Sequence, residues 1–192
     1  MLTPRCSSVA ALLALSILPA AAQQISVHFD PAKTKVSFTL SDVLHTVHGS
    51  FRLRNGDMQF DAATGKASGQ LVVDATTGDS GSGARDSRMH RNILESNKYP
   101  DIVFTPDHVD GKVNLDGDSK VEVHGMFAIH GGTHELTLPA AVHVSHDQVT
   151  VDTRFSVPYQ KWGMKNPSTL FLRVGDQVQI EIQAKGRITT SS

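Results

Sequence analysis

The stretch VEVHGMFAI, residues 121–129, carries an apolar residue or glycine at every odd-numbered position. A period of two is the signature of a β-strand, because successive side chains of a strand point to opposite faces. One face of this strand is therefore apolar along its length, whereas the other face begins with Glu122 and His124. Strands of parallel sheets are covered on both faces and have continuous apolar runs, so this one-sided pattern predicts antiparallel pairing.

The same alternation recurs in six further stretches, which are residues 36–40, 47–53, 71–75, 136–144, 149–157 and 178–184. Dipeptides that favour hairpin turns lie between or beside these stretches, namely Asn55-Gly56, Asp110-Gly111, Asp116-Gly117, Gly131-Gly132 and Gly175-Asp176. Gly49, Gly69 and Gly125 lie on or beside strands, where a closing barrel needs a bend or a close backbone approach. Closure also removes the exposed edges of the sheet. We therefore predict an all-β fold, a meander of hairpins closed into an antiparallel barrel.

Residues 84–96 lack this alternation, and they predict one short helical segment that lies across the barrel. Met89 and Ile93 are four residues apart, so they share one face of a helix. Arg91 and Glu95 have the same spacing and can form an ion pair along the helix.

Residues 1–22 have the composition of an export signal. The basic residue Arg5 precedes the apolar run 9–18, and Ala20-Ala21-Ala22 offers a small-residue cleavage site. A membrane anchor is the competing interpretation, but this run is shorter than the ~20 residues that a spanning helix needs. We therefore predict a signal peptide, residues 1–22, followed by one mature domain, residues 23–192, that is periplasmic or secreted and has no membrane-spanning segment.

Charge and cysteine content argue against several classes of function. The formal net charge is −1, so nothing in the composition attracts nucleic acid or an anionic membrane. The single cysteine, Cys6, is removed with the signal peptide, and the mature domain then has no thiol for catalysis or metal binding.

Two short motifs resemble catalytic signatures and fail in context. Residues 78–81, GDSG, match the nucleophile region of trypsin-like proteases, but the cysteine-flanked histidine segment and second barrel of that family are missing. Residues 134–138, HELTL, begin like a zinc protease motif but end in leucine and alternate like a strand. No acid/base pair of carboxylates follows from spacing either, so we predict that the protein is not an enzyme.

Ten histidines raise the question of a metal site. The pairs His45/His48 and His143/His146 are each three residues apart, and residues at this spacing on a strand point to opposite faces. Neither pair therefore chelates a metal locally unless a bulge redirects one partner. A site assembled from several strands at the barrel mouth, in a metal protein or an enzyme, stays open as an alternative.

Four segments in order resemble the YceI-like family of lipocalin-like, isoprenoid-binding periplasmic proteins. They are residues 36–51, residues 85–104 with RDSRMH and YPDIVF, residues 123–139 with VHGMFAIHG and LTLP, and residues 155–164, FSVPYQKWGM. The resemblance implies an eight-stranded antiparallel barrel whose elongated apolar cavity holds a polyisoprenoid or a similar lipid, such as a quinone tail. His90 stands four places after Asp86, where many relatives have a histidine two places after the aspartate, so the identity of the ligand stays open.

Strand parity together with this resemblance predicts the inward-facing ligand contacts, which are Phe38, Phe51, Phe104, Phe127, Ile129, Leu138, Phe155 and Trp162. Arg85 or His90 would contact a polar head group at the mouth, although an Arg85–Asp86 ion pair that anchors the helix is an equal interpretation. No cofactor is expected beyond the bound lipid.

Composition does not distinguish a hollow barrel from one filled by its own side chains, because a barrel of about eight strands has room for either. A filled barrel that serves as an interaction module is therefore a third hypothesis. The sequence also leaves a homodimer open.

Overall fold

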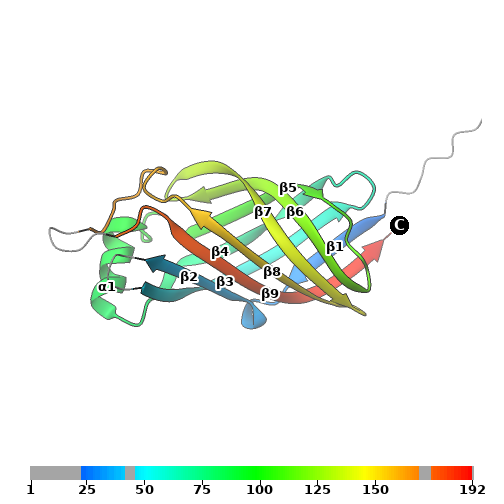
Figure 1. Cartoon of the computed structure of the whole chain (residues 1–192), viewed down its shortest axis with the longest axis horizontal. Helices are drawn as coiled ribbons and strands as arrows, with labels where there is room; N and C mark the ends of the chain where they lie inside the picture. Colours follow the sequence, from blue (N-terminus) through cyan, green and yellow to red (C-terminus); the bar gives the residue numbers. More distant parts are fainter. Residues whose placement is uncertain (1–22, 42–45, 169–173, 192) are drawn as a thin grey trace, which may run out of the picture.

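The computed structural model describes residues 23–41, 46–168 and 174–191. These residues contain nine strands, β1 (Gln24–Phe29), β2 (Lys35–Ser41), β3 (Thr46–Asp61), β4 (Ala67–Asp79), β5 (Asp101–Asp110), β6 (Gly117–Ile129), β7 (Gly132–Ser145), β8 (Gln148–Val157) and β9 (Val178–Ser191). The helical elements are a 3-10 turn η1 (Pro31–Lys33), the helix α1 (Gly83–Arg88) and the wider π-type turn η2 (Met89–Ile93). Figure 1 shows an elongated barrel with α1 at one end and the C-terminus at the other.

The nine strands form a closed barrel with eight strand positions. Every pair of neighbouring strands is antiparallel, and the sheet closes through β3–β4 pairing. Strands β1 and β2 share one position, because both pair with β3 on one side and with β9 on the other. The turn η1 interrupts this position at Pro31, which has no N–H to donate to a ladder. The predicted eight-stranded antiparallel barrel with one short helical segment is confirmed.

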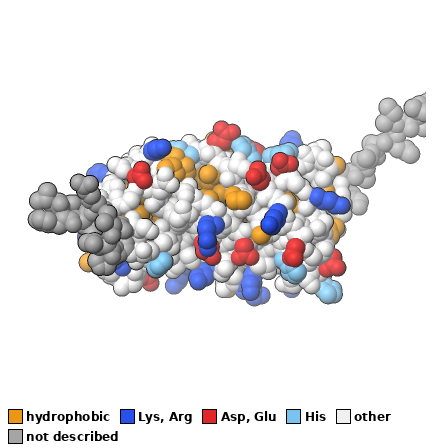
Figure 2. All heavy atoms as spheres, in the orientation of Figure 1, with side chains coloured by type: hydrophobic (Ala, Val, Ile, Leu, Met, Phe, Trp, Pro, Cys, Tyr) orange, Lys and Arg blue, Asp and Glu red, His pale blue; other side chains and the backbone are white. Residues whose placement is uncertain are grey.

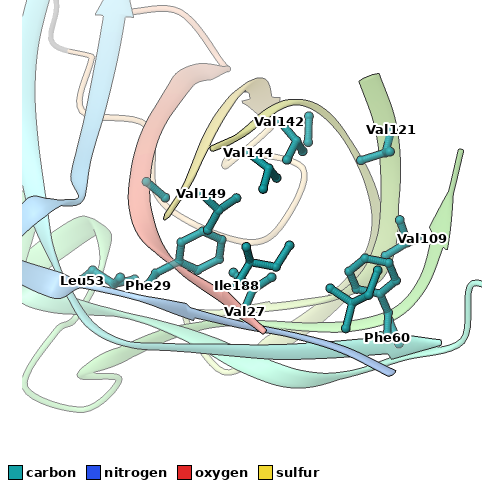
Figure 3. Close-up of a cluster of buried hydrophobic side chains, with 14 residues drawn as sticks. Val27, Phe29, Leu53, Phe60, Val109, Val121, Val142, Val144, Val149 and Ile188 are labelled. Carbon is teal, nitrogen blue, oxygen red and sulfur yellow. The ribbon is translucent and has the colours of Figure 1, made fainter. Parts of the chain in front are cut away.

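Alternation along the strands separates an apolar interior from a polar exterior. The core at the C-terminal end of the barrel includes Ile25, Val144 and Val149, which are almost completely buried (Figure 3). A second core cluster lies toward the helical end and includes Phe127 and Val157. Charged side chains and histidines are spread over the outer face in Figure 2.

One predicted hairpin turn is wrong. Asn55-Gly56 lies inside β3, a strand of 16 residues, and not at its end. The register with β4 shifts between Leu53 and Asn55, so a β-bulge takes up the extra residue and β3 continues to the buried Phe60. The glycines of Gly131-Gly132 do belong to a tight β6–β7 turn, in which His130 and Gly131 both have positive φ.

The helical segment, defined here as Gly83–Ile93, is shorter than the predicted 84–96. It ends because Leu94 closes the last turn and Glu95 takes a left-handed conformation with φ 47°. The Arg91–Glu95 ion pair is not found among the described residues. Glu95 has turned away from the helix axis and contacts His130.

Candidate functional site

A cavity of about 550 Å³ occupies the barrel interior at the helical end, and we call it the outer chamber. Strands β2, β3, β6, β8 and β9 supply about half of its lining residues, all of them apolar. Its lining includes five of the aromatic and aliphatic residues predicted from sequence, Phe38, Phe51, Phe127, Ile129 and Phe155. The inward side of these strands therefore surrounds a space and is not completely filled.

Close packing of backbone and ring shapes one wall of the outer chamber. Phe38 and Phe51 have ring centroids 5.3 Å apart. Opposite Phe38 in the register stands Gly49, and a Cβ atom there would lie 2.2 Å from the Phe38 ring. The predicted need for a small residue at Gly49 is confirmed, because the ring occupies the space that a side chain would need.

A smaller cavity of about 130 Å³ lies deeper in the barrel, and we call it the inner chamber. Its lining includes Phe104 and Leu138 from the predicted set, together with Val113 from the β5–β6 loop. Five side chains line both chambers, and we call this set the waist: Val73, Ile102, Phe127, Phe155 and Ile182.

The helical segment lies over the mouth of the outer chamber. Met89 and Ile93 both contribute to the lining, as their shared helix face predicts. Arg85 and Arg88 also contribute to the lining, although both residues are largely exposed. The mouth therefore combines apolar contacts with two guanidinium groups, and Arg88 was not identified from the sequence.

Ser80 connects Arg85 and Asp86 at the mouth. Arg85 donates from Nε to Ser80 Oγ at 2.7 Å and from Nη2 to the Ser80 carbonyl at 2.9 Å. The Asp86 carboxylate accepts from the Ser80 hydroxyl and backbone N–H, and the hydroxyl contact is the main cause that lowers the pKa of Asp86. Arg85 and Asp86 are thus linked through Ser80, and this linkage anchors the start of the helical segment.

His90 and Trp162 are not part of the cavity lining. His90 Nε2 donates to the Gly78 carbonyl at 2.9 Å, and its Nδ1 lies 3.0 Å from Ser96 Oγ, so the ring joins the helical segment to β4. Trp162 stacks on His134, with ring centroids 4.1 Å apart, and lies 5.7 Å from the Phe127 ring. Trp162 therefore supports a lining residue from behind, and its own contact with ligand stays a prediction.

Several lining residues after β8 are not predicted by the strand alternation. Tyr159 and Met164 are buried and line the outer chamber, and Tyr159 donates its hydroxyl to the Gly175 carbonyl at 2.5 Å. Burial raises the pKa of Tyr159, so the hydroxyl remains a donor. The alternation of the strands gives no information here, because these residues lie in a connecting segment.

Most of the histidines in the described part of the chain contact other polar groups on the surface or at the mouth. On the outer face, His28 contacts Asp57, His143 contacts Asp118, and His124 contacts two carboxylates. Within residues 23–41, 46–168 and 174–191, no group of three His, Cys, Asp or Glu side chains is arranged to hold a metal ion. His45 lies outside the described residues.

Proteins of two Vibrio species have sequences similar to part of this chain. The UPF0312 protein VPA0850 of Vibrio parahaemolyticus is 29% identical over 128 residues, which are 64% of this chain and 66% of the relative. The UPF0312 protein VVA0736 of Vibrio vulnificus is 30% identical over 112 residues, 57% of each chain. The aligned part thus spans less than two thirds of these relatives' own length.

Two solved structures share the fold at low sequence identity. BcnA of Burkholderia cenocepacia superposes with a TM-score of 0.68 at 21% identity, over 82% of this chain and 98% of that chain. A polyisoprenoid binding domain from Saccharophagus degradans gives a TM-score of 0.65 at 18% identity, over 85% and 98% of the two chains.

A closed antiparallel barrel with an apolar internal cavity defines a lipocalin-like protein. Residues 28–186 match the model of the YceI-like domain. The chain belongs to the YceI-like family, as the four sequence segments had indicated.

Proposed function

We propose that this protein binds a long apolar molecule, an isoprenoid chain or a quinone tail, inside the barrel and performs no chemistry on it. The outer chamber carries this proposal, because a cavity of about 550 Å³ with apolar walls falls in the usual range for ligand sites. The polyisoprenoid binding domain from Saccharophagus degradans, which has the same fold, supports the same class of ligand. The open volume also favours a ligand-holding barrel over one filled by its own side chains.

The polar end of the ligand would lie at the mouth, beside the helical segment. Arg85 and Arg88 line the chamber there and also reach solvent, so their guanidinium groups can donate hydrogen bonds to a head-group oxygen. Arg85 already donates to Ser80, which orients its guanidinium. Arg88 is therefore the better candidate for direct contact with a head group.

Export to the periplasm or the medium belongs to the same proposal. The predicted signal peptide, residues 1–22, lies outside the described residues and stays a prediction. In the described part of the chain, no helix is long and apolar enough to cross a membrane.

A pair of neighbouring substitutions on β6 tests ligand binding. Ile129 faces the outer chamber, whereas the adjacent Ala128 belongs to the opposite face of the strand. We expect wild-type protein and Ala128→Trp, purified from a quinone-producing host, to release close to one apolar chain per molecule on solvent extraction. Ile129→Trp should fill part of the chamber and release much less, while circular dichroism reports the same β-structure. Absence of any stoichiometric lipid from the wild type would overturn the proposal.

A further inference from the structure

Exposed basic side chains surround the mouth of the outer chamber. Some belong to the helical segment or follow it closely, and others belong to the segment after β8, which lies at the same end of the barrel (Figure 1). Met89 from the first segment and Met164 from the second both line the outer chamber, so both segments border its mouth. We call the exposed basic residues of these segments the cationic rim: Arg88, Arg91, Lys98, Lys161 and Lys165.

Neighbouring carboxylates do not neutralise the cationic rim. In the described part of the chain, the lysines and arginines that form ion pairs lie elsewhere, and they are Lys33, Arg54, Arg154 and Arg187. Two carboxylates at the mouth end, Asp86 and Glu95, have other hydrogen-bond partners. Asp79 and Asp176 are exposed at this end. Positive charge therefore exceeds negative charge around the mouth.

The other end of the barrel has the opposite sign. Exposed carboxylates of Asp110, Asp116 and Asp118 lie where β5 ends and β6 begins, and Asp147 lies in the β7–β8 turn. The formal net charge of −1 therefore conceals a separation of charge along the barrel. The total charge gave no reason to expect attraction to an anionic membrane. An exposed cluster nevertheless acts on charges within a Debye length of roughly 10 Å, whatever the sign of the distant end.

The position of the mouth identifies the kind of surface that the cationic rim fits. Ala84 and Arg88 are exposed and also line the outer chamber, so the chamber reaches the surface among the basic residues. Exposing a long apolar chain to water is unfavourable in proportion to its area, and direct contact between the mouth and a bilayer avoids that exposure. A cluster of Lys and Arg beside an apolar opening matches anionic head groups above acyl chains.

We propose that the protein docks mouth-first on an anionic phospholipid surface through the cationic rim, and that it exchanges its apolar ligand with the bilayer there. The exchange rests on the proposed function, whereas the docking requires no ligand. Each rim cation should strengthen binding to anionic vesicles about fivefold at low salt. Because the rim charges are exposed to solvent, added salt should weaken this binding.

Two pairs of substitutions separate the mouth from the other end. Arg91→Gln with Lys165→Gln removes two rim charges, and neither residue lines the chamber. Lys112→Gln with Lys120→Gln removes two exposed charges toward the other end. Flotation measures binding to vesicles of phosphatidylcholine alone and of phosphatidylcholine mixed with phosphatidylglycerol. We expect the rim variant to bind the mixed vesicles about tenfold or more weakly than the wild type, and the Lys112/Lys120 variant to bind them like the wild type.

Trp162 reports which end of the barrel faces the bilayer. It is the only tryptophan of the chain, and it lies between Lys161 and Lys165 in the sequence. Mixed vesicles with a nitroxide-labelled head group should therefore quench the fluorescence of the bound wild type. Bound protein without quenching would overturn the mouth-first orientation.

The outcomes separate docking from ligand binding. If mixed vesicles bind the wild type no better than phosphatidylcholine does, the rim suits an acidic protein and docking on lipid is wrong. Docking through the mouth is equally wrong if both pairs of substitutions weaken binding to the same degree. Should the double rim variant lose β-structure by circular dichroism, Arg91→Gln and Lys165→Gln are measured singly, with about a fivefold loss expected for each.

Solvent extraction of the same wild-type protein tests the proposed function independently. Protein that carries an apolar chain but does not bind vesicles keeps the function and refutes the docking. Protein that docks but never contains an apolar chain keeps the docking and refutes the function.

Discussion

The Nε2 atom of His130 lies 2.6 Å from the Oε2 atom of Glu95, and this contact joins the β6–β7 turn to the end of the helical segment. Both residues have positive φ, 52° and 47°, so each backbone bends sharply where the contact forms. The Tyr99 ring packs on the imidazole with centroids 5.0 Å apart. With Ser80 anchoring the other end, the helical segment is attached to the barrel at both of its ends.

Loss of the His130–Glu95 contact should loosen the helical segment. In His130→Asn the turn is preserved, because asparagine tolerates the left-handed conformation, but the shorter side chain no longer reaches Glu95. Amide hydrogen exchange across residues 83–96 should become several-fold faster. The matched control is His143→Asn, which removes an exposed histidine–carboxylate contact of 2.7 Å on the outer face. Equal exchange rates in residues 83–96 of both variants would contradict this role.

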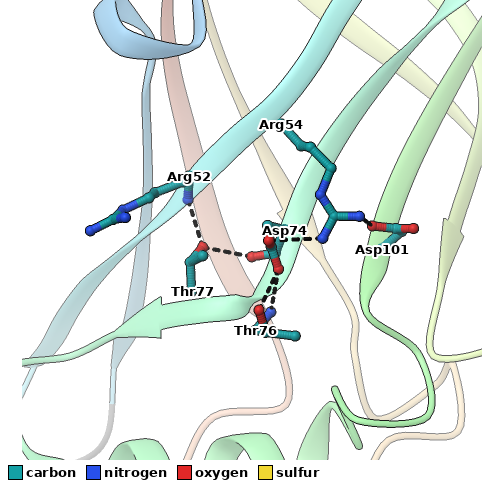
Figure 4. A network of polar contacts seen from close by, with 6 residues as sticks. All are labelled: Arg52, Arg54, Asp74, Thr76, Thr77 and Asp101. Atoms are coloured by element: carbon teal, nitrogen blue, oxygen red, sulfur yellow. Dashed lines mark hydrogen bonds and ion pairs between the residues drawn. The ribbon is translucent and has the colours of Figure 1, made fainter.

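Arg54 should stabilise the barrel where β3, β4 and β5 meet. Its guanidinium lies between Asp74, at 2.8 Å, and Asp101, and these two carboxylates face each other in the β4–β5 register (Figure 4). Arg54→Gln would leave two like charges opposite each other. We expect a lower urea midpoint at pH 7, and Arg154→Gln, which breaks an exposed pair with Glu181, should change the midpoint less.

Acid should remove most of the difference between wild type and Arg54→Gln. Burial acts to raise the pKa of Asp74, but hydrogen bonds from Arg54 and Thr76 outweigh it and lower the pKa below the ordinary value. A carboxyl of this kind stabilises the fold above its unfolded pKa of about 3.9, and the contribution is lost as the pH falls through the lower folded value. The two urea midpoints should therefore approach each other as the pH falls from about 5 through the unfolded value of about 3.9 and below it. A constant difference across this range would show that charge is not the cause.

The contribution of His124 to the stability of the fold should have the opposite pH dependence. Hydrogen bonds to Asp107 and then to Glu135 raise the pKa of His124 above the ordinary value. Its contribution to stability is complete below the unfolded pKa of about 6.5 and is lost as the pH rises through the higher folded value. His124→Gln should therefore lower the urea midpoint at pH 5.5 more than at pH 9, and Asp107→Asn should do so in the same direction. A midpoint difference that grows with pH would refute this assignment.

Gly49→Ala tests how closely the Phe38 ring packs against β3, and Gly83→Ala is its matched control. At Gly49 an added methyl group would overlap the Phe38 ring and approach the Asp79 carbonyl, so we expect destabilisation of about 1–3 kcal/mol. At Gly83 nothing lies within 4 Å of the added carbon, and alanine should be neutral or stabilise the start of α1 by up to about 1 kcal/mol. Urea denaturation of both variants at pH 7 measures the difference.

The fold was predictable because the alternation of apolar and polar residues in each long strand shows which side chains face inward and which face outward. Phe127 and Ile129 point inward in the structure, as their parity requires, and the glycine at position 49 has the expected close neighbour. The bulge at Asn55 was not predictable, because only the partner strand reveals that β3 continues. Strand β1 also escaped notice, since a run of six residues next to the predicted export segment gives a weak signal.

The candidate site was predictable in part. Parity places Phe38 and Phe155 on the inner face. Whether inward residues surround a space depends on the diameter of the closed barrel, and no local sequence pattern predicts that diameter. Trp162 lies behind Phe127 because a connecting segment folds onto β7, and the His130–Glu95 contact joins residues 35 positions apart. Such contacts arise from tertiary packing, so periodicity does not reveal them.

The position that β1 and β2 share determines when the barrel can be completed during folding. In the finished sheet Gln24 pairs with Ser191, so strands from the two ends of the described chain lie side by side. A chain emerges from the ribosome with its N-terminal residues first, and β1 and β2 must wait for β9 before both of their edges are paired. Contacts of such large sequence separation form slowly. Until β9 arrives, the apolar interior has an open seam, and in this interval the chain is most exposed to aggregation.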